Sequence, residues 1–230
     1  MPFFSKVFKH KDATFSSAKS KTQVADLNDH AAVPTRPRFV STWASKTIDP
    51  EEVEELIHAC TLEMKSRAEA LEAPFFLLPF RPETDISPAR TFIRNFFAET
   101  HSGSLHYTGA SLQKELVLTE HAVLCSILKW CWTRMPGGVV TWTTYEGFRM
   151  GEQASLMARN AFSTFVPLSV DSSARERIIF DFFDLLSAVA AHGKLNGLGG
   201  RKLSRMAAWW AFEHTDSEEG FDGGYKSWMM

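Results

Sequence analysis

The sequence has few cysteines and no long apolar run, and each shortage excludes a class of protein. Its 230 residues include only three cysteines, Cys60, Cys125 and Cys131. Their number is odd and they lack the close spacing of a disulfide framework or a zinc site. No apolar run reaches the roughly 18 residues of a membrane-spanning helix, and the N-terminus lacks the pattern of a secretory signal. The sequence therefore predicts a cytoplasmic protein without a bound metal, with its cysteines packed as small apolar side chains.

An excess of charge of one sign is also lacking, since 25 basic side chains stand against 27 acidic ones, for a formal net charge of −2. This balance does not support a strongly basic nucleic-acid binder. No phosphate-binding GxxxxGK[ST] loop, HExxH or GxSxG motif occurs. The clustered glycines Gly197, Gly199 and Gly200 follow no predicted strand, as a dinucleotide site would require. We therefore expect no cofactor and no nucleic acid, and the motifs alone favour a helical binding or structural domain.

What is abundant is aromatic side chains, with 19 phenylalanines and 7 tryptophans within an apolar fraction of 44%. A chain of this length buries roughly 70–75% of its unfolded surface, so an aromatic-rich core is expected. The close pairs Trp130/Trp132 and Trp209/Trp210 are a special case. Adjacent side chains do not all face one core, so the sequence predicts that one tryptophan of each pair lies near a surface or near a segment that follows in a longer protein.

Residues 1–38 differ from the rest of the chain. Five lysines and one acidic residue give residues 1–21 a local net charge of +4, and apolar side chains lie between the lysines. Two interpretations stay open: a disordered, solvated leader, or a basic amphipathic patch that touches an anionic membrane surface. In the second interpretation the membrane contacts are Phe3, Phe4, Lys6, Phe8, Lys9 and Lys11.

From residue 47 onward, apolar residues recur with the period of a helix and no strand alternation is visible. Asp49 and Pro50 are helix-start residues, and Gly193 is placed as a helix C-cap. Residues 99–118 read as a loop with some local structure. The predicted helices cover residues 49–70, 87–97, 119–135, a stretch from 143, 151–164, 171–193 and 200–210.

Together these helices predict an all-α domain of about seven or eight helices over residues 39–230. Its fraction of helical residues is somewhat above that of an average globular protein. The last residues, 225–230, contain Tyr225, Trp228, Met229 and Met230. An exposed apolar terminus is disfavoured, so this segment either docks or continues into a longer protein. We favour the second alternative, in which the helical domain is incomplete at its C-terminus.

Two segments resemble parts of the Rho GTPase-activating (RhoGAP) domain in the expected order. The stretch FFLLPFR at 75–81 lies between two predicted helices and is similar to the arginine-finger loop of that family, with Arg81 at the arginine. Residues 123–148 resemble the helices that follow in the family, with Lys129 on the family lysine.

A third segment, LLSAVAAHGKLNGLGGRKL at 185–203, is the most specific match, with Asn196 on a family asparagine. Together the three segments extend the resemblance over roughly residues 47–215. Two positions depart from the family. Lys202 stands in place of an asparagine, and Thr133 stands in place of a second arginine, with Arg134 next to it. The resemblance therefore implies a degenerate RhoGAP-like domain.

The chain is also similar to one fungal polarity family, first described as a multicopy suppressor of a budding defect and also as a meiotically up-regulated protein. The segments GGRKLSRMAAWWAFE at 199–213 and FDGGYKSW at 221–228 look like that family, as does the basic leader. The resemblance implies a long cytoplasmic scaffold with a RhoGAP-like domain near its N-terminus that continues past Trp228. It also implies recruitment to the cell cortex, at sites of polarised growth or at the bud neck and septum.

The function implied by this resemblance is binding of a Rho-family small GTPase in cell polarity, morphogenesis and cell-wall signalling, without notable catalysis. The implied GTPase contacts are Lys129, Arg134, Asn196, Arg201 and Lys202. Two alternatives stay open. One is an active GTPase activator that uses Arg81 as its arginine finger; the other is a helical module that binds other polarity or septation scaffolds and no GTPase.

Overall fold

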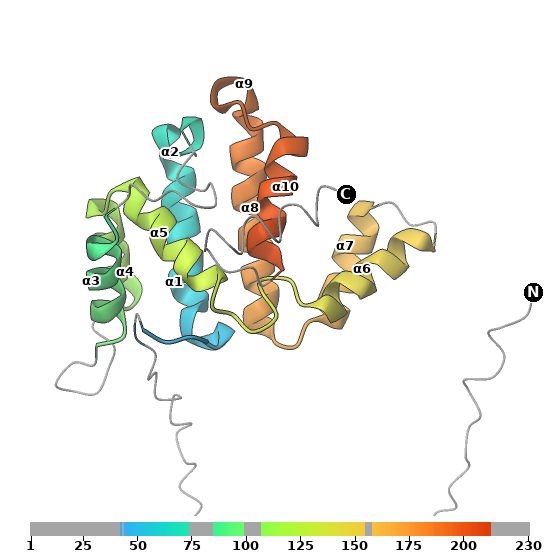
Figure 1. Cartoon of the computed structure of the whole chain (residues 1–230), viewed down its shortest axis with the longest axis horizontal. Coiled ribbons are helices and arrows are strands. Elements are labelled where there is room, and N and C mark those ends of the chain that lie inside the picture. The colour runs from blue at the N-terminus through green and yellow to red at the C-terminus, as the bar shows by residue number, and fades with distance from the viewer. Residues whose placement is uncertain (1–41, 43, 74–84, 99–106, 155–157, 213–230) are drawn as a thin grey trace, which may run out of the picture. The chain divides into compact units, whose positions relative to one another are not determined.

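The structure, a computed structural model, describes residues 42, 44–73, 85–98, 107–154 and 158–212. These residues form helices and no strands, so the predicted all-α class is confirmed (Figure 1). The predicted leader lies outside the described residues, and the division of the chain at residue 38 stays a prediction. The described helices are α1 (Pro50–Ser66), α2 (Ala68–Glu72), α3 (Ser87–Phe96), α4 (Gly109–Leu118), α5 (His121–Trp132), α6 (Trp142–Gln153), α7 (Ala158–Ser169), α8 (Ser173–Ala191), α9 (Gly193–Asn196) and α10 (Gly200–Ala211).

Local capping explains where several helices begin. Asp49 and Glu52 form a reciprocal capping box at the start of α1, followed by Pro50 in the first turn. Before α3, the Ser87 amide donates to Asp85 at 2.9 Å, which lowers the pKa of that carboxyl below its ordinary value. The cap of α8 is Ser172, whose hydroxyl accepts from the Arg175 amide, and not the neighbouring Asp171 as the spacing suggested.

The structure contains three helices that the sequence pattern did not separate or find. The predicted first helix is interrupted at Arg67, which divides it into α1 and α2. Helix α4 occupies 109–118, part of the expected loop, and it begins with a Thr108 capping box. Gly193 does not cap α8 but begins the short α9, which ends at Gly197 with a left-handed φ of 69°.

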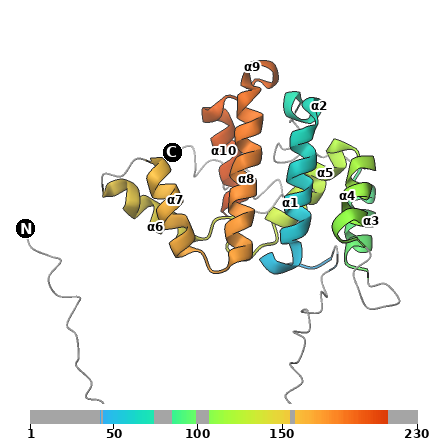
Figure 2. The ribbon, with the colours of Figure 1, turned by 180° about the vertical axis from the view of Figure 1, so that it is seen from behind.

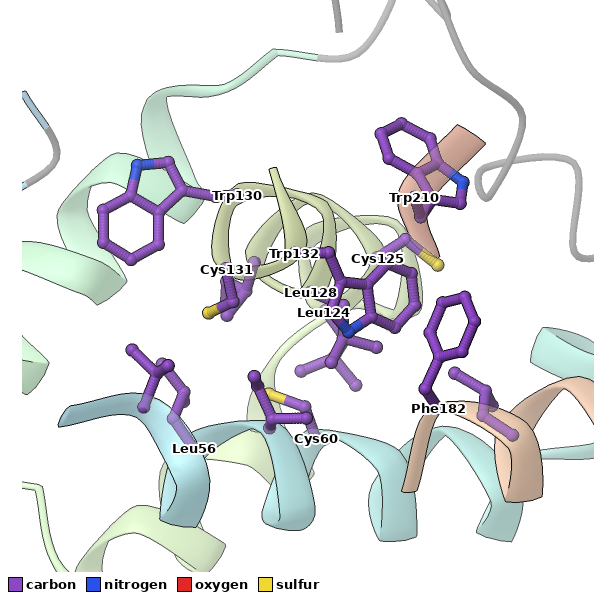
Figure 3. Packing of buried hydrophobic residues seen from close by; sticks show 14 of the residues in the cluster. Leu56, Cys60, Leu124, Cys125, Leu128, Trp130, Cys131, Trp132, Phe182 and Trp210 are labelled. Atoms are coloured by element: carbon purple, nitrogen blue, oxygen red, sulfur yellow. The ribbon is translucent and has the colours of Figure 1, made fainter. Parts of the chain in front are cut away.

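Helices α1 and α8 run side by side through the middle of the described domain (Figures 1 and 2). In both views α3, α4 and α5 lie on the α1 side, while α10 and the α6–α7 hairpin lie on the α8 side. The core is centred on α5, where Trp132 packs edge-on against Phe182 at 5.0 Å between ring centres and lies 6.4 Å from Trp210 (Figure 3). These aromatic contacts join α5, α8 and α10 into one hydrophobic core.

All four side chains are buried, so the expectation that one tryptophan of each pair lies near a surface is wrong. A place near a segment that follows in a longer protein stays a prediction. Trp130 and Trp132 project from different sides of α5 (Figure 3). The Trp130 ring packs near that of Phe97, at 6.2 Å between ring centres, and the Arg134 guanidinium lies over it. A helix packed on more than one side therefore buries side chains that point in different directions.

The three cysteines are buried and free, as predicted. Cys60, Cys125 and Cys131 face the same core as Trp132 (Figure 3). Burial raises the pKa of the Cys125 thiol to about 12 and raises the pKa values of the other two thiols as well. They behave as small apolar residues and not as nucleophiles.

Candidate functional site

One end of the helical domain joins α2, α8 and α9, and Asn196 stabilises this junction. The Asn196 side-chain amide donates to the carbonyl oxygens of Leu71 and Val189, both at 2.8 Å. Its side-chain oxygen accepts from the Leu198 amide at 2.7 Å. The residue predicted as a GTPase contact therefore has a structural role that fixes three segments to one another.

This junction also fixes where the segment with the candidate arginine finger begins. Leu71 lies near the end of α2, and residues 74–84 follow directly. Arg81 is among them, so the candidate finger itself lies outside the described residues. What the structure places beside α9 is the point of departure of the Arg81 segment from α2.

Exposed basic side chains gather on α9 and on the first turn of α10. Lys194, Arg201 and Lys202 are all exposed, and no acidic residue lies in the first turn of either helix. The first turn of α10 also presents the positive end of a helix dipole. We call these three exposed residues the α9–α10 basic surface, and side chains of this charge favour a partner of opposite charge.

Lys129 lies away from this basic surface. Its ammonium group stands over the Trp210 ring, 5.4 Å from the ring centre. Trp210 is eight residues after Lys202, which is roughly 12 Å along a helix axis at about 1.5 Å per residue. Lys129 is partly buried, and its ammonium group makes a cation–π contact with this ring.

Arg134 also has a structural role. Its guanidinium donates to the Ser45 carbonyl at 3.0 Å and to the Trp130 carbonyl at 3.3 Å, and it stacks 5.0 Å from the centre of the Trp130 ring. The Arg134 carbonyl accepts from the Ile48 amide at 3.0 Å. Arg134 therefore ties the end of α5 to the segment before α1. Of the predicted GTPase contacts, the structure brings Asn196, Arg201 and Lys202 together, and it places Lys129 and Arg134 elsewhere.

Sequence reasoning missed an apolar groove of about 440 Å³ between the α6–α7 hairpin and the α8–α10 pair. One signal for it was available, because Phe180 and Phe183 fall outside the buried stripe of α8 and are 40% and 39% exposed. The predicted membrane contacts at residues 3–11 lie outside the described residues. Within the described ranges, no helix has the length and apolar character to cross a membrane, and no group of three or more His, Cys, Asp or Glu side chains is placed to hold a metal ion.

Comparison with known proteins gives a family match over most of the chain. The family model described as the meiotically up-regulated protein Msb1/Mug8 domain matches residues 47–230. The morphogenesis-related protein MSB1 of Saccharomyces cerevisiae is 29% identical over 166 residues, which cover 70% of this chain and 14% of that protein. The meiotically up-regulated gene 8 protein of Schizosaccharomyces pombe is 27% identical over 181 residues, covering 74% and 24% respectively. No solved structure matches the chain.

Proposed function

The chain belongs to the Msb1/Mug8 domain family, and on that premise we propose that it is a helical binding module of a fungal morphogenesis scaffold. A relative named as morphogenesis-related supports the cellular role. The chain spans only 14% and 24% of the two yeast relatives, so the proposal concerns this module within a larger protein. Its place of action is the cell cortex, at sites of polarised growth or at the bud neck and septum.

The molecular function we propose is binding of a Rho-family GTPase through the α9–α10 basic surface, without notable acceleration of GTP hydrolysis. The observation that carries the proposal is the exposure of Lys194 on α9 and of Arg201 and Lys202 at the start of α10, with α9 packed against α2, after which the Arg81 segment begins. Charged groups at the rim of an interface raise the association rate and select partners of opposite charge. Other polarity or septation scaffolds are further partners under this proposal.

Catalysis is not part of the proposal because Lys202 and Thr133 stand where the RhoGAP family has an asparagine and a second arginine. In GTPase activation an arginine stabilises charge on the transferring phosphoryl group. This raises the rate of GTP hydrolysis by a factor of about 10³–10⁵. Asn196 and Arg134 bond to backbone carbonyls of this chain. Their polar side-chain groups therefore stabilise the fold of this chain.

The test is binding and GTP turnover with a fungal Rho-family GTPase in its GTP-bound and GDP-bound forms. We expect wild-type chain to bind one form and the double variant Arg201→Ala/Lys202→Ala to bind about threefold to tenfold more weakly, since two exposed charges contribute roughly 1 kcal/mol in total. The matched control is Arg94→Ala/Lys114→Ala, which removes two exposed basic side chains from α3 and α4. We expect the control to bind like wild type.

The rate of GTP hydrolysis distinguishes a binding module from an active GTPase activator. We expect no acceleration of GTP hydrolysis by wild-type chain or by Arg81→Ala. An acceleration that Arg81→Ala removes would replace the proposal with an active GTPase activator. No association in either nucleotide state would leave a helical module that binds other proteins.

A further inference from the structure

The apolar groove offers an interaction surface that is separate from the α9–α10 basic surface and does not depend on GTPase binding. One wall is the α6–α7 hairpin, with Tyr145, Phe148 and Phe162. The other wall is formed by α8 and α10. That wall includes Phe182, Phe183, Leu186, Leu203, Ala207 and Ala211.

The lining specifies an apolar occupant. Among the residues that the structure describes, none with a charged side chain lines the groove. The hydroxyl of Thr144 is already bonded to Thr141 and to the Ser169 carbonyl, and that of Ser204 is bonded to the Arg201 carbonyl. With a volume of about 440 Å³, the groove is within the size range of sites that bind apolar groups. Aromatic and aliphatic side chains suit it better than any polar ligand.

The hairpin wall is built as a unit that faces the groove with aromatic rings. Helices α6 and α7 approach closely because of Gly151, where an added Cβ would lie 2.6 Å from the Phe165 ring. Phe162 reaches from α7 to α8, with its ring centre 5.4 Å from those of both Phe180 and Phe183. An aromatic side chain that enters beside these rings gains edge-to-face contacts as well as burial.

We propose that the occupant of this groove is the segment Phe221–Met230 of the same chain. Phe212 lines the groove and packs edge-on against Tyr145 at 5.5 Å, so the described chain stops at the groove itself. The next eight residues, 213–220, are polar and include four acidic side chains. They are followed by Phe221, Tyr225 and Trp228.

Length and spacing both fit this occupant. Eight residues span up to roughly 26–29 Å when extended, which is enough to return to the groove from Phe212. Phe221, Tyr225 and Trp228 are spaced i, i+4 and i+7, the pattern with which an amphipathic helix lays its apolar side into a hydrophobic groove. The segment would then join the hairpin to the α8–α10 wall and cover otherwise exposed apolar surface.

The test is hydrogen exchange of the full 230-residue chain, read by mass spectrometry on peptides from 221–230. We expect wild-type amides in this segment to exchange at least about tenfold more slowly than in an unstructured peptide. Amides of a docked segment exchange only during the short times when the segment opens. Ser187→Arg places a charge at the groove, where Ser187 is exposed and lines it, and it should abolish this protection. Ala191→Arg is the matched control on the same helix, exposed but outside the lining, and should leave protection unchanged.

A second variant keeps the test independent of any effect of Ser187→Arg on folding. Phe221→Ser/Trp228→Ser removes two anchors without altering the core, and should increase binding to the vacated groove of ANS, a dye that binds exposed apolar surface. Fast exchange of 221–230 in wild type would overturn the proposal. Protection that grows with protein concentration would also overturn it, by assigning the groove to a second copy of the chain.

Discussion

At the scale of single residues, two buried threonines differ only in their hydrogen bonds. Thr61 and Thr144 are both fully buried. The hydroxyl of Thr61 has no hydrogen-bond partner among the residues that the structure describes, whereas that of Thr144 is bonded to Thr141 and to the Ser169 carbonyl. A buried polar group without a partner destabilises the native state by about 1–3 kcal/mol.

We therefore predict opposite effects for the same substitution at these two sites. Thr61→Val should raise the free energy of unfolding by about 1 kcal/mol, because it removes an unpaired hydroxyl and keeps the branched shape. Thr144→Val should lower it by about 1–2 kcal/mol, because it leaves a carbonyl partner unpaired. Urea denaturation of the two variants measures both, and a destabilised Thr61→Val variant would show that its hydroxyl is satisfied in solution.

Residue type alone did not distinguish a binding residue from a structural one. The resemblance singled out Asn196 and Arg134 as partner contacts, and the structure uses their polar atoms to bond Leu71, Val189 and Ser45. Leu71 lies 125 residues from Asn196 in the sequence, and Ser45 lies 89 residues from Arg134. No local sequence pattern predicts partners at such distances. The resemblance also singled out Arg201 and Lys202, and the structure leaves both exposed at the start of α10, where charged side chains are usually solvated.

At the scale of elements, Arg175 connects the start of α8 to the turn that follows α5. Its guanidinium donates to the Gly138 carbonyl and, at 3.0 Å, to the Pro136 carbonyl, while its Nε donates to Asp171 at 2.8 Å. The side chain is 3% exposed. Charge-assisted bonds of this kind are roughly twice as strong as neutral ones.

Arg175→Met should therefore lower the free energy of unfolding by about 2–4 kcal/mol, since it leaves buried carbonyl groups without donors. The control is Arg177→Met on the same helix. The Arg177 side chain is 62% exposed and pairs with Glu54 at 2.5 Å, and an exposed pair contributes at most about 1 kcal/mol. Guanidinium denaturation compares the two, and equal losses would contradict the role assigned to Arg175.

Long helices with a clear apolar period were predictable, and short ones were not. The start of α1 followed from its capping residues, and the approximate extent of α8 followed from its apolar spacing. Helix α4 was missed because its buried face contains only Leu112 and Leu116. The break between α1 and α2 has no local signal, because Arg67 is held there by the Leu116 and Thr119 carbonyls at the end of α4.

At the scale of the whole molecule, positive charge occurs in two separate regions of the chain. One is the α9–α10 basic surface, in the described domain. The other is the stretch 1–21, outside the described residues, with a net charge of +4 and interleaved apolar side chains. A small net charge of −2 for the chain therefore hides two basic regions with different proposed partners, a GTPase and an anionic membrane surface.

The membrane proposal predicts that the two basic regions are not interchangeable. Lys6→Gln/Lys9→Gln/Lys11→Gln in the full chain should weaken binding to vesicles of about 30% phosphatidylserine by at least about tenfold, because each lysine near such a surface contributes about 1 kcal/mol. The control, Lys194→Gln/Arg201→Gln/Lys202→Gln, makes the same change of charge in the helical domain and should bind vesicles like wild type. Cosedimentation measures both, and the effect should shrink as salt is raised because charges at a surface are screened. A leader variant that sediments like wild type would assign residues 1–38 to the solvated interpretation.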